Sequence, residues 1–217
     1  MKLYDKKEAL PIALIVIIAI AGWYFYPLLP DLIPSHWNVY GEVDGWMNKS
    51  FAIWFFPVLI AALYALLSVV PVMDPLRANI RLFSHLYFWF KVVFVLFMGS
   101  LYLMTIWAGL GHELNVGQLV MWGVAILFFF LGLMMPQIKK NYTIGIRLPW
   151  TLHSEKVWDK THKFGGQLFV ALAILMVLVS FLKGACAFWI LIGGIILLML
   201  TLVIYSYWEY RKIEKSA

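Results

Sequence analysis

The chain has 217 residues, of which 64% are hydrophobic and 13% are charged, and this composition excludes an ordinary soluble domain. The formal net charge of +6 does not indicate nucleic-acid binding, because basic residues also collect on the inner side of membrane proteins. The single cysteine, Cys186, excludes an intramolecular disulfide and a cysteine-based metal cluster. We therefore expect an all-α integral membrane protein with no direct nucleic-acid contact.

Six apolar runs follow one another along the chain. The hydrocarbon core of a bilayer is roughly 30 Å thick and is crossed by about 20 apolar residues in a helix. The first run follows two lysines, as in a signal peptide, but it continues beyond the small residues where cleavage would fall, so we expect an uncleaved span. The sequence therefore predicts one six-span domain over residues 1–217, with spans at 10–29, 51–73, 86–110, 116–136, 165–182 and 185–208.

The placement of lysine and arginine predicts the orientation of these spans, because positively charged segments stay on the cytosolic side. With the N-terminus inside, the inner segments carry 14 of these residues, and the outer segments carry only Lys49 and Lys183. The remaining one, Lys91, lies in the third span near its inner end, and we expect its side chain to extend to the inner interface. The prediction is a multi-pass protein with both termini inside.

The first external connection, residues 30–50, carries turn-forming residues. Its prolines discourage continuation of the first helix. Gly41 and the Asp44-Gly45 pair predict a hairpin-like segment between residues 38 and 48.

The same connection is rich in aromatic and ionisable side chains. His36, Glu42 and Asp44 offer possible metal ligands, although their spacing is not that of a defined metal site. An alternative is an interfacial loop whose aromatic residues anchor it at the bilayer surface. We expect no bound metal or cofactor here or elsewhere.

The internal connection, residues 137–164, contains a predicted helix. Ser154 is expected to cap a short amphipathic helix over residues 155–162. One face of this helix is acidic and the neighbouring face is basic, which suits the headgroups of the inner leaflet. The acidic face comprises Glu155, Trp158, Asp159 and His162, and the basic face comprises Lys156, Lys160 and Lys163.

Three interpretations of this connection remain open. Arg147 is expected to hold the loop against the spans by pairing with Glu155 or Asp159. Alternatively, the connection is a cytosolic linker held by ordinary ion pairs. Asp159 and His162, three residues apart on a helix, also suit a proton relay or a metal site, but no second pair at matching spacing supports that use.

The external connection contains the stretches IPSHWN (33–38) and GEVDGW (41–46), and the internal connection contains NYTIGIRLPWTL (141–152). Together these stretches resemble the SdpI family of bacterial membrane immunity proteins. The external stretches resemble a small uncharacterised, DUF1648-like module that often occupies the first external loop in this family, and the internal stretch resembles the family signature. The signature continues with Glu155, Trp158, Thr161-His162 and Gly165-Gly166, while Leu148 stands where many members have threonine.

The resemblance implies a protein of the bacterial cell membrane that protects its producer against a secreted hydrophobic toxin peptide. It also implies recruitment of a cytosolic transcriptional repressor to the membrane, and no enzyme activity. On this basis we expect two sites in contact with ligand or partner, besides membrane lipid. The toxin would contact His36, Trp37, Asp44 and Trp46, and the repressor would contact Arg147, Pro149, Trp150, Glu155, Trp158, Asp159 and His162.

Two other classes of function are compatible with six spans. A small-solute or ion transporter usually carries ionisable residues near the bilayer midplane or internal repeats, and the predicted spans show neither. A membrane hydrolase needs a nucleophile with a base, or a metal site, at bilayer depth, and no HExxH or GxSxG motif occurs. The transporter is therefore the main alternative.

Overall fold

The computed structural model describes residues 6–182 and 185–215. Six helices in this part of the chain are long and apolar enough to cross a membrane, which confirms the six predicted spans. They are α1 (Ala9–Phe25), α2 (Lys49–Met73), α4 (Ser84–Gly109), α5 (Val116–Met134), α7 (Glu155–Val179) and α8 (Cys186–Glu214).

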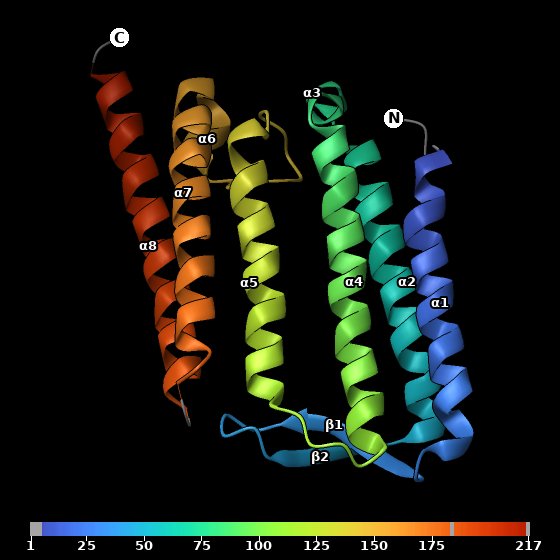
Figure 1. The fold of residues 1–217 in the computed structure, drawn as a ribbon. Coiled ribbons are helices and arrows are strands. Elements are labelled where there is room, and N and C mark those ends of the chain that lie inside the picture. The colour runs from blue at the N-terminus through green and yellow to red at the C-terminus, as the bar shows by residue number, and fades with distance from the viewer. Residues whose placement is uncertain (1–5, 183–184, 216–217) are drawn as a thin grey trace.

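The start of α1 and the end of α8 lie at the same end of the bundle (Figure 1). This arrangement agrees with termini on one side of the membrane, and the cytosolic location of that side stays a prediction. We call it the inner end and the opposite one the outer end. Single-turn 3₁₀ helices flank some spans, namely η1 (Lys6–Glu8), η2 (Tyr26–Leu28) and η3 (Met135–Gln137).

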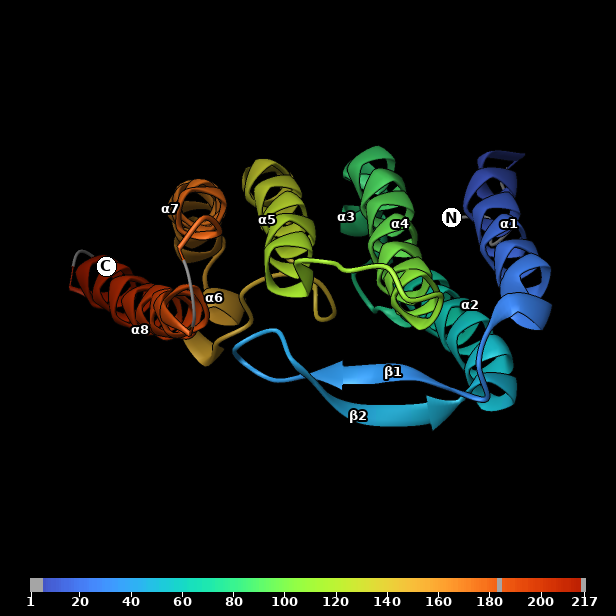
Figure 2. The same cartoon turned by 60° about the horizontal axis from the view of Figure 1, so that its bottom comes forward.

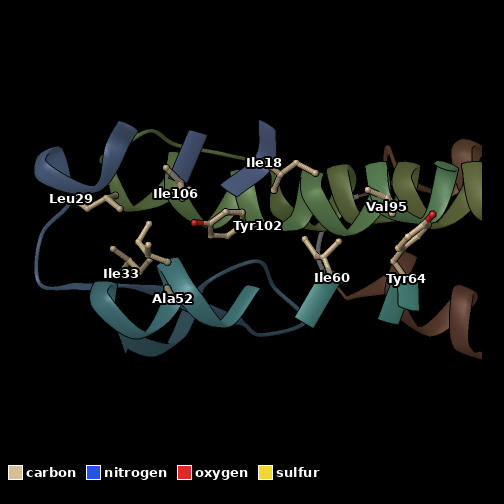
Figure 3. Packing of buried hydrophobic residues seen from close by; sticks show 10 residues of the cluster. Ile18, Leu29, Ile33, Ala52, Ile60, Tyr64, Val95, Tyr102 and Ile106 are labelled. Atoms are coloured by element: carbon tan, nitrogen blue, oxygen red, sulfur yellow. The ribbon is translucent and has the colours of Figure 1, made fainter. Parts of the chain in front are cut away.

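The spans form two groups, each with its own apolar core. Helices α1, α2 and α4 pack around one core, in which Ile18, Ile60 and Tyr102 are each buried (Figure 3). Helices α5, α7 and α8 surround another, which includes Met121, Met176 and other buried side chains. The two groups meet where α4 of the first stands next to α5 of the second (Figure 2). The molecule is therefore built from an N-terminal and a C-terminal group of three spans.

An antiparallel hairpin of β1 (Leu32–Trp37) and β2 (Val43–Asn48) covers the outer end (Figures 1 and 2). The predicted hairpin is present but begins at residue 32 and not at residue 38. The turn lies at residues 38–42, where Gly41 has φ +84°, a conformation that favours glycine. The Asp44-Gly45 pair, which we expected to turn, instead lies within β2.

At the inner end, two short helices sit between the spans. Helix α3 (Arg77–Leu82) lies between α2 and α4, and α6 (Pro149–His153) lies just before α7. An irregular segment that we call the inner loop (residues 138–148) connects η3 to α6. The two connections that carry the family resemblance therefore lie at opposite ends of the bundle, as the orientation predicted.

The predicted amphipathic helix at residues 155–162 is not a separate element. It forms the first two turns of α7, which runs without a break from Glu155 to Val179. Within this helix, Gly166 is the point where α5 approaches closely. A Cβ added there would stand 2.6 Å from the carbonyl oxygen of Gly132. Small residues at such crossings allow helices to pack closely in membranes. Ser154 does cap the helix, accepting a hydrogen bond from the Val157 N–H at 3.4 Å.

Lys91 does not extend to the inner interface as we expected. It is 1% exposed, and its ammonium donates to both carboxylate oxygens of Glu8 at 2.8 Å and to Ser68 at 3.1 Å. Tyr64 also donates its hydroxyl to Glu8. A buried charge is costly unless it is paired and hydrogen-bonded, and Glu8, just before α1, supplies the counter-charge inside the bundle. The pair lies near the inner end of the bundle, because Glu8 ends η1 directly before α1.

Candidate functional site

The outward face of the hairpin presents three of the four residues predicted to contact a toxin. Successive residues of a strand point to opposite faces, so Asp44 and Trp46 share one face of β2. His36 joins them, because its Nδ1 lies 2.5 Å from a carboxylate oxygen of Asp44. Trp46 is 59% exposed. This face is an aromatic surface beside a hydrogen-bonded imidazole and carboxylate.

Trp37, the fourth predicted residue, lies on the other face of the hairpin. It is half-buried and stands opposite Val43 in the sheet register. The same face carries Ile33, which is fully buried against Leu29 and Ile106 (Figure 3). This contact holds the hairpin on the N-terminal group of spans, so Trp37 belongs with the anchoring face.

Glu42 does not join His36 and Asp44 in the structure. Its carboxylate accepts a hydrogen bond from the Asn38 side chain at 2.9 Å, and the Asn38 oxygen in turn accepts from the Glu42 and Tyr40 N–H groups. These bonds build the turn of the hairpin. Within residues 6–182 and 185–215, no group of three metal-ligating side chains comes together.

At the inner end, Trp158 and His162 hold the two sides of the inner loop. Trp158 donates its indole N–H to the Ile138 carbonyl at 2.7 Å. The His162 Nε2 accepts from the Ile146 N–H at 3.0 Å, so Nδ1 carries the proton and donates to the Trp158 carbonyl at 2.8 Å. The two rings stack with centroids 4.1 Å apart.

Burial changes the expected role of these two residues. Trp158 is 0% exposed and His162 is 1% exposed, so neither side chain lies on the inner surface, where we had placed them as partner contacts. Gly145 fits over them with φ +116°, and an added Cβ would collide with the His162 ring. We therefore interpret both residues as supports that set the shape of the inner loop.

Arg147 does not pair with Glu155 or Asp159 as we expected. Its guanidinium donates to the Tyr142 carbonyl at 2.6 Å. Asp159 and Glu155 instead face Lys139 and Lys140, each at 3.9 Å, because the inner loop brings these two lysines to the first turns of α7. Arg147 therefore closes the inner loop on itself and remains exposed.

The other predicted partner contacts lie on α6. Pro149 begins this helix and is exposed. Trp150 is half-buried and donates its indole N–H to Ser206 of α8 at 2.8 Å. Helix α6 is thereby attached to the last span, and its exposed side continues the surface that Arg147 begins.

Asp74 was not identified from the sequence, although it connects the two halves of the molecule. This buried residue directly follows α2, and its carboxylate accepts from the Leu76 N–H at 2.7 Å. The same carboxylate accepts from the Tyr142 N–H and the Thr143 hydroxyl, both at 2.9 Å. An aspartate before a proline at the end of a span predicts a helix end, but nothing in the sequence indicates its partners in the inner loop.

Helix α2 is continuous between the two candidate sites. It begins at Lys49, directly after β2, and Asn48 caps it by accepting from the Ser50 N–H at 2.8 Å. It ends one residue before Asp74. A single helix therefore connects the outer hairpin to the residue that holds the inner loop.

Comparisons with known proteins match the segments that contain the outer hairpin and the inner loop. Residues 137–206 match the model described as the SdpI/YfhL protein family, and residues 13–61 match a domain of unknown function, DUF1648. A relative from Bacillus subtilis (strain 168), named Immunity protein SdpI, is 25% identical over 211 residues, which cover 97% of this chain and 99% of the relative. No solved structure matches the chain. The two matched regions contain the outer hairpin and the inner loop, which confirms the resemblance drawn from the sequence.

Proposed function

We propose that the chain, whose residues 137–206 match the SdpI/YfhL protein family, is a membrane immunity protein of this family. It binds a secreted hydrophobic toxin peptide and signals to a cytosolic transcriptional repressor. The observation that carries this proposal is the similarity over nearly the whole chain to a protein named Immunity protein SdpI. It acts by binding and not by catalysis.

The outward face of the hairpin supports the toxin contact. Trp46 and Tyr40 are 59% and 69% exposed, at the level where the spans end and a membrane-active peptide arrives. Exposed aromatic residues supply large contact areas and dominate the energetics of many interfaces. The opposite face of the hairpin is packed on the bundle, so a peptide bound outside would act on a supported surface.

Coupling between the two ends is supported by α2 and Asp74. A ligand changes a distant site only if it binds one arrangement of the molecule better than another. Displacement of the hairpin would act on α2, and α2 ends at the carboxylate that holds Tyr142 and Thr143. The repressor would then contact the exposed residues Arg147 and Pro149, whose loop depends on those bonds.

A small-solute or ion transporter is the second candidate, and one observation favours it. An ionisable residue inside a span is a functional hypothesis by default, and Lys91 paired with Glu8 is such a residue. The ammonium is, however, saturated by Glu8 and Ser68. We therefore favour a structural role for this pair.

Growth of a sensitive host under challenge with secreted hydrophobic toxin peptides tests the proposal. Cells producing the wild-type chain should grow where cells without it do not. Truncating an aromatic hot spot costs on the order of 2 kcal/mol, or roughly thirtyfold in affinity, so Trp46→Ala should weaken protection at unchanged abundance. Trp54→Ala is the matched control, because Trp54 is 60% exposed but lies on α2 outside the hairpin. Equal protection by wild type and Trp46→Ala would exclude this face as the contact.

The inner contact is tested separately. A photo-crosslinking residue at Arg147 should capture a cytosolic regulator when toxin is present, and one at Lys6, exposed at the same end, should not. Equal capture at both positions would contradict a docking surface at the inner loop.

A further inference from the structure

A small cavity lies at the inner end, between the two groups of spans. It measures about 160 Å³, and its walls come from α3, the inner loop and the first turns of α7. The lining side chains are Asn79, Leu82, Lys139, Lys140, Glu155, Trp158 and Asp159.

Two positive and two negative side chains line this cavity without forming close ion pairs. Lys139 and Asp159 are 3.9 Å apart, and so are Lys140 and Glu155, beyond the usual range of about 2.7–3.2 Å for hydrogen bonds. The chain forms close pairs elsewhere, for example Lys160 with Glu209 at 2.6 Å. At 3.9 Å, neither of these two pairs satisfies its charged groups with a close hydrogen bond, so the four side chains can form hydrogen bonds to a ligand.

The walls of the cavity are fixed by contacts that do not use the four charges. Asn79 donates its side-chain N–H to the Lys140 carbonyl at 2.7 Å, which holds α3 to the inner loop. Trp158 is fully buried and bonded to Ile138. A ligand would thus enter a supported cavity, and ordering its walls would cost little.

The balance of charge determines the class of ligand. A simple anion would meet two carboxylates, and a simple cation would meet two lysines. A zwitterion that carries an anionic and a cationic group on one short linker satisfies both pairs. The cavity also lies where the spans end, at headgroup depth, and Leu82 on its rim is 73% exposed, as suits contact with acyl chains.

We propose that this cavity binds the phosphoethanolamine headgroup of a membrane lipid. The phosphate is held by Lys139 and Lys140, whose ammonium groups donate hydrogen bonds to its oxygens. The primary ammonium of the headgroup donates to Glu155 and Asp159, as a lysine would. The lipid thereby joins the inner loop to α7 and α3. The proposal is independent of any toxin or repressor.

Retention of defined lipids by the purified full-length protein, measured by native mass spectrometry, tests this site. Phosphatidylethanolamine should be retained over phosphatidylcholine with the same acyl chains, because a trimethylated ammonium donates no hydrogen bond. It should also be retained over phosphatidylglycerol, which has no cationic group. Hydrogen bonds to charged groups contribute about 1.5–3 kcal/mol, so we expect each preference to be about tenfold or more. Equal retention of phosphatidylethanolamine and phosphatidylcholine would overturn the proposal whatever the variants show.

Two double variants separate the two halves of the headgroup. Glu155→Gln with Asp159→Asn should remove the preference for phosphatidylethanolamine and leave retention of phosphatidylglycerol intact. Lys139→Gln with Lys140→Gln should lower the retention of both lipids. Lys156→Gln with Glu214→Gln is the matched control, because these exposed residues do not line the cavity. A preference that survives both double variants would place the lipid elsewhere.

A further arm distinguishes a lipid from a soluble ligand. Free phosphoethanolamine should compete with the lipid only weakly, because it lacks the acyl chains that lie against Leu82 and the spans. Competition by free phosphoethanolamine at the same concentration as the lipid would indicate a soluble metabolite as the ligand and contradict a lipid site.

Discussion

Thr143 in the inner loop donates its hydroxyl to the Asp74 carboxylate at a distance of 2.9 Å, although 69 residues separate them in the sequence. Asp74 directly follows α2 of the N-terminal group of spans. Thr143 lies in the inner loop, between α5 and α7 of the C-terminal group. Because Asp74 is 2% exposed, water cannot readily replace these bonds. Together with the bond from the Tyr142 N–H to the same carboxylate, this contact links the end of α2 directly to the inner loop.

Removing this acceptor should loosen the inner loop. Asp74→Ala leaves the Leu76 and Tyr142 N–H groups and the Thr143 hydroxyl without their acceptor, and a buried unsatisfied donor costs about 1–3 kcal/mol. We expect faster hydrogen exchange at residues 138–148 and a lower melting temperature in detergent. Thr143→Val should show a smaller loss and Thr143→Ser nearly none, since serine keeps the hydroxyl. Exchange unchanged in Asp74→Ala would contradict the link.

The Lys91–Glu8 pair gives a second prediction, which separates structure from transport. Lys91→Met alone leaves the Glu8 charge in the bundle without its partner, and breaking a buried pair typically costs about 3–5 kcal/mol. The double change Glu8→Gln with Lys91→Met removes both charges and should restore abundance and melting temperature. It should also keep any protection against toxin. A double variant that is stable but inactive would instead show that the charges themselves act, as a transporter requires.

Gly145 gives a third prediction, with a matched control in the same chain. An alanine there must adopt φ +116° and collide with the His162 ring. Gly111 has φ +87° with open space around its Cβ direction, so Gly111→Ala meets only the backbone strain of roughly 1 kcal/mol. Gly145→Ala should therefore lower the melting temperature more and expose the inner loop to protease. Equal effects of the two changes would show that His162 does not support the loop.

Orientation gives a fourth prediction. Tyr40→Cys in the hairpin turn should react with an impermeant thiol reagent in intact cells, and His153→Cys on α6 should react only after lysis. Both residues are exposed, whereas Asn141 is fully buried and would be a poor position to label. The exposed Cys186 is first replaced by serine, because it would react by itself. Labelling in the reverse order would overturn the assignment of inner and outer ends.

The sequence by itself determined the six spans and the positions of the two connecting segments, because the length of an apolar helix and the turn chemistry of Gly41 are local properties. It also indicated the helix cap at Ser154. The sequence predicted a short helix over residues 155–162 and a separate span over residues 165–182, whereas the structure has one helix from Glu155 to Val179. The close approach of α5 at Gly166 depends on the packing of the two helices, which the sequence does not give.

Only the tertiary structure decided the partners of the charged and polar residues. Glu8 and Lys91 are 83 residues apart, and their pairing depends on how α1 and α4 pack. Likewise Trp158 and His162 turn inward while Glu155 and Asp159 turn toward lysines of the inner loop, although helical spacing had grouped all four. Spacing on a helix sets which side chains are neighbours, whereas the packing of the other helices sets which face is buried, and a buried polar group then takes whatever partner that packing brings within reach.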